Sequence, residues 1–109
     1  MRIRILRAAV LDLESGRDFY DLQESGVGDY FVECLSADIG SLTLYAGIHR
    51  VYHGFHRLIA KRFPYAVYYK MIGGQAVVFR VLDCRRSPAR NRKALEDGTG
   101  EGGEIITPA

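Results

Sequence analysis

The stretch Tyr65-Ala-Val-Tyr-Tyr-Lys-Met-Ile-Gly-Gly-Gln-Ala-Val-Val-Phe-Arg-Val-Leu82 decides the fold. Its first part, Tyr65 to Met71, is rich in Tyr and Val and follows Pro64, a residue that suits the first position of a strand. The pair Gly73-Gly74 predicts a two-residue hairpin turn. The run Gln75 to Cys84 is the most apolar of the chain and predicts the central strand of a sheet.

Alternation along this last strand assigns its side chains to two faces of the sheet. We expect Val77, Phe79 and Val81 on one face. We expect Val78, Arg80 and Leu82 on the other face, which should be partly open to solvent because it carries an arginine. Phe55 to Lys61 is a further strand-like run, and His49 to Gly54 is expected to be a loop.

The spacing of apolar residues before this sheet changes from that of a strand to that of a helix. Arg2 to Leu6 alternates charged and aliphatic side chains, which predicts a first strand. Ala8 to Glu24 and Tyr30 to Leu44 carry apolar residues at spacings of three and four, which is typical of amphipathic helices, and Ser25-Gly-Val-Gly28 separates them. Neither helix can bury its apolar stripe alone, so we expect a helical hairpin against one face of the sheet.

The predicted class is therefore α+β: an N-terminal strand, an α-helical hairpin, and three strands that complete a small, mainly antiparallel sheet. A basic C-terminal arm follows, with a short helix over Pro88 to Leu95. The core is expected to include Leu13, Leu35, Ile39, Val67, Phe79 and Val81. With 109 residues we expect one domain, residues 1–95, and a flexible Gly-rich acidic tail, residues 96–109. Gly98 to Ala109 should be dispensable for stability.

Charge is sharply segregated along the chain. Residues 1–48 hold four Arg against eight acids, residues 49–93 hold eleven Lys and Arg against the single acid Asp83, and residues 94–109 hold four acids and no cation. A block this basic predicts an anionic partner, either nucleic acid or an acidic protein segment. The alternative is a solvated basic face that binds nothing.

Other classes of site have little support in the sequence. Cys34 and Cys84 are too few for a disulfide scaffold and match no zinc spacing. The three histidines form H-x3-H-x2-H, but the glycines around them oppose a helix and no acid or cysteine is near, so we expect no metal and no cofactor. No run of about 20 apolar residues and no secretory signal is present, so we expect no membrane span and a cytoplasmic location.

Three local motifs in this order carry a family resemblance. Lys61-Arg-Phe-Pro-Tyr-Ala-Val-Tyr-Tyr69 resembles the "FPY…Y" strand of the RelE/ParE toxins of type II toxin–antitoxin (plasmid stabilisation) systems, and Tyr45-Ala-Gly-Ile-His49 precedes it as in that group. Val77 to Pro88 resembles the family's last strand with its basic, Pro-containing turn. The similarity extends over about Ile3 to Leu95. It implies a toxin neutralised, in a hetero-oligomer, by an antitoxin with an acidic, flexible C-terminal segment.

The resemblance also implies positions to inspect for catalysis. RelE-like members cleave messenger RNA in the ribosome with two lysines, two arginines and a tyrosine; without gaps these positions fall on His56, Leu58, Tyr65, Arg86 and Arg92. Leu58 cannot polarise a phosphate, and only Arg86 keeps the expected cation. His56 could serve as a base and Tyr65 as an acid, or Tyr65 could be a packed strand residue.

ParE-like members instead poison DNA gyrase, which requires a binding surface and no catalytic set. The cations available for binding a target or the antitoxin are Arg57, Lys61, Arg80, Arg85, Arg86, Arg90 and Arg92. We therefore expect a ParE-like growth inhibitor that is not an enzyme. The alternatives are a RelE-like endoribonuclease, with His56, Tyr65 and Arg86 as its catalytic residues, and a paralogue that only binds antitoxin.

Overall fold

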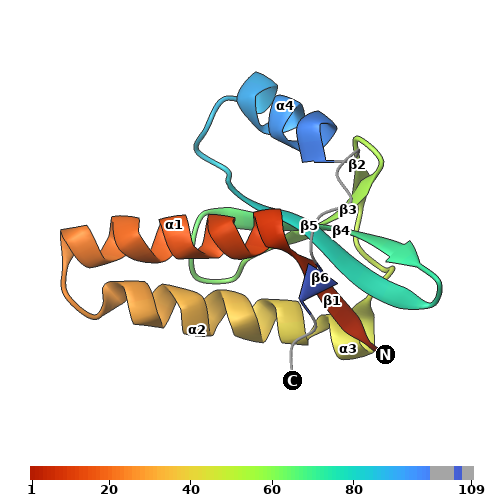
Figure 1. Cartoon of the computed structure of the whole chain (residues 1–109), viewed down its shortest axis with the longest axis horizontal. Coiled ribbons are helices and arrows are strands. Elements are labelled where there is room, and N and C mark those ends of the chain that lie inside the picture. The colour runs from red at the N-terminus through yellow and green to blue at the C-terminus, as the bar shows by residue number, and fades with distance from the viewer. Residues whose placement is uncertain (99–104, 107–109) are drawn as a thin grey trace.

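A computed structural model describes residues 1–98 and 105–106 of the chain (Figure 1). The α+β class and the predicted order of a strand, two helices and three further strands are confirmed. The elements are β1 (Ile3–Leu6), α1 (Arg7–Gln23), α2 (Val27–Gly40), α3 (Leu42–Tyr45), β2 (Val51–Tyr52), β3 (Phe55–Ile59), β4 (Tyr65–Ile72), β5 (Gln75–Asp83), α4 (Pro88–Gly98) and β6 (Ile105–Ile106). None of the helices among these residues is both long and apolar enough to cross a membrane.

The sheet is built around the predicted hairpin of β4 and β5. Gly73 and Gly74 both have positive φ angles, of 57° and 75°, which is the backbone of the turn that suits the twist of two adjoining strands. The strand order is β2-β3-β4-β5-β1-β6, and only β1 runs parallel to its neighbour β5. The expectation of a loop over His49 to Gly54 was wrong, because Val51 and Tyr52 pair with β3 as the short edge strand β2.

The helical hairpin packs through a close approach between α1 and α2. Phe31 of α2 lies against Gly16 of α1, where a Cβ atom would come within 2.5 Å of the Phe31 ring. The second helix begins at Val27, earlier than predicted, after Gly26 with its left-handed φ of 93°. It also ends earlier, at Gly40, and the separate short helix α3 follows.

A β-bulge in β5 changes which side chains face the helices. Tyr69 pairs with Val78 but Tyr68 pairs with Arg80, so Phe79 is an additional residue with no partner of its own. Beyond the bulge the alternation shifts by one position. The expected grouping of Val81 with Val77 and Phe79, and of Val78 with Leu82, was therefore wrong: Val78 and Val81 both pack on the hairpin side, whereas Phe79 and Leu82 share the opposite cluster.

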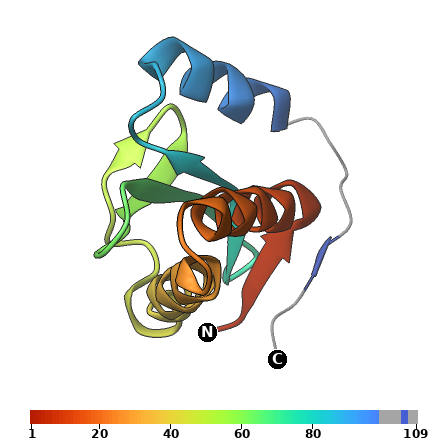
Figure 2. The same ribbon diagram turned by 90° about the vertical axis from the view of Figure 1, so that its left-hand side faces the viewer.

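The sheet has a core on each side. The larger core lies under the hairpin, as Figure 2 shows for α1 and α2. The smaller core lies under α4 and consists of Phe55, Ala66, Tyr68, Leu82 and Leu95, so this face is covered by a helix. Of the six predicted core residues, Leu35, Ile39, Val67 and Val81 are buried as expected. Leu13 and Phe79 are only half-buried.

The predicted tail lies mainly outside the described residues. Residues 99–104 and 107–109 are not among them, so its flexibility stays a prediction. Its first residues, 96–98, belong to α4, and Ile105 and Ile106 form β6 antiparallel to Leu6 and Ile5 at the outer edge of β1. This dipeptide therefore adds a short strand to the sheet, which the expectation of a tail without regular structure did not include.

Candidate functional site

The end of β5 opens onto a polar cleft between α1 and the start of α4. This α1–α4 cleft has a volume of about 300 Å³. Its lining residues come from α1, β4, β5 and the segment that begins α4: Asp12, Ser15, Gly16, Phe19, Tyr65, Val81, Asp83, Arg86 and Arg90. Tyr65, Arg86 and Arg90, three of the predicted site residues, therefore meet in one place.

Asp12 of α1 contacts the part of β5 that lies beyond its pairing with β1. β1 pairs with β5 only as far as Val78, and further along the Val81 backbone N–H donates to Asp12 Oδ2 over 2.9 Å. The Arg80 guanidinium donates to both oxygens of the same carboxylate, over 2.7 and 2.8 Å, and to the Ala94 carbonyl over 3.3 Å. Arg80, expected on a partly open face, joins α1, β5 and α4, and its side chain is 19% exposed. Its role as a binding residue stays a prediction.

Asp83 forms a second bidentate pair at the end of β5. Arg85 donates from Nε to Asp83 Oδ1 over 3.0 Å and from Nη2 to Oδ2 over 2.8 Å. Burial alone would raise the pKa of Asp83, but the hydrogen bonds from Arg85 and the charges of Arg85 and Arg86 hold that pKa below its ordinary value. Asp83 is therefore ionised at neutral pH and already carries its counter-ion.

Tyr65 lies between the core and the cleft. Its ring packs against Phe31 and Tyr20, with centroid distances of 4.8 and 6.3 Å. Burial, the charge of Asp83 and that of Tyr20 raise the pKa of Tyr65 to about 12. The hydroxyl is consequently protonated near neutral pH and is a poor proton donor to a reacting group, since effective general acids have pKa values near the working pH.

Arg86 differs from its sequence neighbour Arg85 and from Arg80 of β5 in its hydrogen bonds. Its backbone N–H donates to the Asp83 carbonyl over 3.2 Å, and its side chain is half-buried. The Nε atom is buried, and within the described part of the chain it has no hydrogen-bond acceptor. Ser87 then caps α4, because its Oγ accepts from the Arg90 N–H over 3.1 Å, and Pro88 occupies the first helical position. This Ser-Pro pair fixes where Arg86 and Arg90 lie.

His56 lies elsewhere in the sheet. It pairs with Tyr69 across β3 and β4 and stacks on that ring at a centroid distance of 5.1 Å. Its Nδ1 is 2.7 Å from the His49 carbonyl, and His49 Nδ1 contacts the Tyr69 hydroxyl, which also accepts from the Gly47 N–H. Tyr65 precedes Tyr69 by four positions on β4, roughly 13 Å of strand. The hypothetical acid–base pair of Tyr65 and His56 is therefore not brought together.

Two further predicted cations lie outside the cleft. Arg57 lies against the rings of Tyr52 and Tyr68, at 5.2 and 6.0 Å from their centroids, and donates to Cys84 Sγ over 3.8 Å. Such stacking is a favourable use of a guanidinium inside the fold. Lys61 is exposed in the connection from β3 to β4, at the same end of the sheet as Tyr65 but outside the lining of the cleft.

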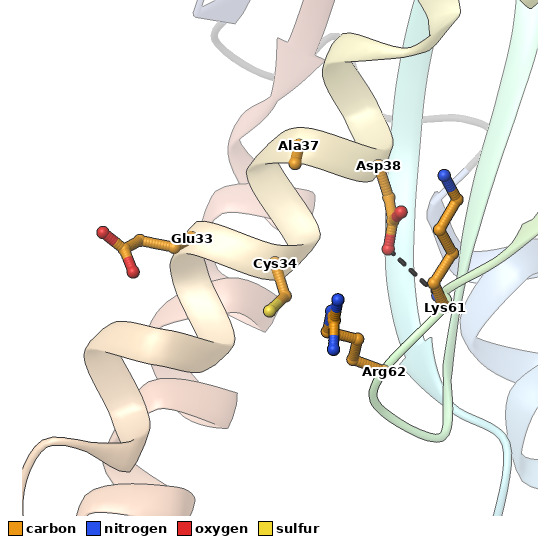
Figure 3. A pocket seen from close by; sticks show the side chains of 6 residues that line it. All are labelled: Glu33, Cys34, Ala37, Asp38, Lys61 and Arg62. Carbon is orange, nitrogen blue, oxygen red and sulfur yellow. Dashed lines mark hydrogen bonds between the residues drawn. The ribbon is translucent and has the colours of Figure 1, made fainter.

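Figure 3 shows Lys61 beside α2. Its backbone N–H donates to Asp38 Oδ2 over 3.2 Å. The surrounding cavity of about 320 Å³ is lined by two acids and two cations together with Cys34 and Ala37: Glu33, Asp38, Lys61 and Arg62. This cavity and the α1–α4 cleft each hold two acids and two cations, but the two acids of the cleft are paired with Arg80 and Arg85, which lie outside its lining. The last predicted cation, Arg92, is exposed on α4.

From the sequence we did not predict that Asp12 and Asp83 form ion pairs with Arg80 and Arg85. Asp83 had a local signal, because it is the only acid among eleven cations and precedes Arg85 by two positions. Asp12 had none, since 68 positions separate it from Arg80. In the described residues no group of three His, Cys, Asp or Glu side chains is placed to hold a metal ion.

The same fold occurs in a solved structure described as the chromosomal ParDE TA system from P. aeruginosa. The two chains superpose with a TM-score of 0.68, their sequences are 19% identical, and the match covers 74% of this chain and 92% of that chain. At this identity the likeness shows a shared fold. No protein-family model matches the sequence, and neither does any curated protein.

Proposed function

We propose that the chain is the toxin of a bacterial type II toxin–antitoxin module: a ParE-like growth inhibitor that acts on DNA gyrase in the cytoplasm and is neutralised by a cognate antitoxin. The observation that carries the proposal is the fold shared over 92% of a chain from a ParDE system. The basic block of residues 49–93 supports an acidic antitoxin segment as the partner in a hetero-oligomer, because this block contains eleven Lys and Arg residues and one acid. A segment that folds on binding can wrap such a surface.

The separation of the hypothetical catalytic residues supports a binding inhibitor over an RNase. Cleavage through a ribose hydroxyl requires a base and an acid around one phosphate. His56 is engaged with Tyr69 and His49, whereas Tyr65 lines a cleft at the far end of β4 with a pKa of about 12. One observation favours the RelE-like alternative, namely that Tyr65 and Arg86 share that cleft.

Growth arrest after induction of single variants without antitoxin tests the proposal. A binding inhibitor should remain toxic as His56→Ala and Tyr65→Phe, since neither side chain would move a proton, and should lose toxicity as Arg86→Ala. An RNase should lose about 10²–10⁴-fold in rate when its general acid or base is removed. Soluble expression of each variant is the control. DNA breaks with intact messages are expected for the unaltered chain; message cleavage that stops in the His56 and Tyr65 variants would refute the proposal.

A further inference from the structure

Three arginines gather at the end of β5, and the chain supplies a carboxylate to two of them. Arg80 forms a bidentate pair with Asp12, and Arg85 forms one with Asp83. In both pairs two guanidinium nitrogens donate to two oxygens, which is the strongest arrangement for these groups. Neither Arg80 nor Arg85 lines the α1–α4 cleft.

Arg86 is the third of these arginines and has no such partner. Within the described residues no ion pair or hydrogen bond joins its side chain to a carboxylate, and its buried Nε has no acceptor. A buried donor without an acceptor destabilises the folded chain, and more so when the group is charged. Arg86 lines the cleft together with the exposed Arg90, while both acids of the cleft are already paired.

We propose that the α1–α4 cleft binds a carboxylate side chain of an acidic peptide, which completes at Arg86 the pairing that Asp12 and Asp83 provide for its neighbours. This inference rests on the proposed function in one respect: the peptide is a segment of the antitoxin. Arg90 adds a second positive charge at the mouth of the cleft. The bound Glu or Asp accepts from one terminal nitrogen of Arg86 and from Nε, which the side chain must expose by turning in the cleft because Nε is buried in the free chain.

The surroundings of Arg86 favour a carboxylate over a phosphate. Asp12 and Asp83 already place two carboxylates in the lining, and a phosphate with its greater charge would meet stronger repulsion from them than a single carboxylate does. Part of the wall is apolar, formed by Gly16, Phe19 and Val81, and Phe19 is 44% exposed. Such a wall suits the methylene groups of a glutamate side chain.

The Nε–H signal of Arg86 in an NMR spectrum of the ¹⁵N-labelled full chain provides a direct test. The probes are hexaglutamate, hexaglutamine, inorganic phosphate and a short DNA duplex at 0.15 M salt. We expect hexaglutamate to shift the Arg86 signal at concentrations at which the other three do not. Arg86→Gln should weaken hexaglutamate binding about tenfold or more. Arg86→Lys, which keeps the charge but not the planar fork, should be intermediate.

Arg17→Gln is the matched control, because it removes one charge from an exposed position of α1 outside the cleft. It should change binding less than about twofold, since an exposed charge outside the lining makes no hydrogen bond to the ligand and is screened by salt. Equal losses in Arg17→Gln and Arg86→Gln would refute the site. A stationary Arg86 signal, or a response to phosphate or DNA below the hexaglutamate concentration, would also refute it.

The growth assay separates failure of this site from failure of the proposed function. A chain that arrests growth but whose Arg86 signal ignores hexaglutamate retains the toxin proposal and loses the carboxylate site. A chain that binds hexaglutamate at Arg86 but does not arrest growth retains the site and loses the toxin proposal.

Discussion

The two faces of the sheet are built on different principles. Under the hairpin, α2 buries Phe31, Leu35 and Ile39 against apolar strand residues, and α1 adds Ala9. Under α4, a single helix contributes Leu95, and cations lie among aromatic rings: Arg57 over Tyr52, and Lys70 with its Nζ 4.6 Å from the Phe55 centroid. The hairpin face is thus an apolar core, whereas the α4 face is a smaller core with cations within it.

This difference separates the source of stability from the source of binding. Burial of apolar area drives folding in proportion to the area removed from water, so the larger core should dominate the free energy of unfolding. The α4 face and its edge hold arginines in place. The Asp12–Arg80 pair connects α1 on the hairpin side with α4 on the other side of the sheet. Substitutions on the hairpin side should therefore unfold the chain, and those around α4 should alter binding before they alter the fold.

The largest effect is expected for Phe31→Ala. Phe31 is fully buried against Gly16, Tyr65 and Phe63, so its removal leaves a cavity that the rigid helix pair cannot fill. We expect the free energy of unfolding to fall by about 3–5 kcal/mol, measured by urea denaturation. Leu22→Ala is the control, because Leu22 is 88% exposed, and it should change little. Equal losses in the two variants would mean that the hairpin core is not the main source of stability.

A smaller loss is expected for Leu95→Ala on the other face. Leu95 is 1% exposed and is the fully buried anchor of α4 in the smaller core. We expect a loss of about 2–3 kcal/mol, toward the lower end for such truncations, because a single helix at the rim can relax into the space. Faster amide hydrogen exchange confined to α4 should accompany it. Lys93→Ala, on an exposed position of the same helix, should be nearly neutral. A loss above that of Phe31→Ala would reverse the ranking of the two faces.

The link between the faces should matter less than either core. Asp12→Asn keeps an oxygen for the Val81 N–H but removes the charge that pairs with Arg80. Because both side chains are mostly buried, we expect a loss of about 1–2 kcal/mol from a weakened charge-assisted hydrogen bond. Asp18→Asn, an exposed acid on the same helix, serves as the control. No difference between the two variants in urea denaturation would mean that the pair does not connect α1 to β5 energetically.

Local sequence signals were enough for most of the fold. Gly73-Gly74 predicted the central hairpin, and the basic arm with its Pro88 predicted the last helix, since both features constrain the backbone where they stand. The period of the apolar residues predicted the helix pair, with errors at its ends. Strand β2 was missed because two residues are too few to show a period.

The errors about faces and partners have a different origin. The bulge at Phe79 shifts the alternation of β5 by one position, and the sequence Val77-Val-Phe-Arg-Val is compatible with either register. Arg80 was expected on an open face because its partner Asp12 comes from a distant helix. The sequence therefore identified the basic segment. Tertiary packing determined that Arg80 pairs with Asp12 and that Arg86 lines a cleft.

His49, in the loop that precedes β2, should make the free energy of unfolding weakly dependent on pH. Burial and the charge of nearby His56 lower the pKa of His49 below its ordinary value of 6.5. Below that pH the unfolded chain binds more protons at this residue than the folded chain, so the free energy of unfolding should fall as the pH drops from about 7 toward 5. His49→Gln should flatten this dependence in urea denaturation. An unchanged slope would show that His49 does not contribute to it, and His53→Gln, exposed in the turn, is the control.

The smallest effect is expected at the outer edge of the sheet, where β6 pairs with β1. Among the described residues two pairs join these strands, and so short a pairing at the edge of a sheet adds little stability. The α4 anchor Leu95 lies before the tail, so a chain ending at Asp97 retains both cores. We expect its melting temperature to stay within about 4 °C of the full chain, since about 1 kcal/mol corresponds to 4–8 °C for a domain of this size. A chain that also lacks α4 is the control and should melt much lower. If removal of the tail alone had a comparable effect, β1 would depend on the β6 pairing, and the stability of the sheet would not come mainly from its two helical faces.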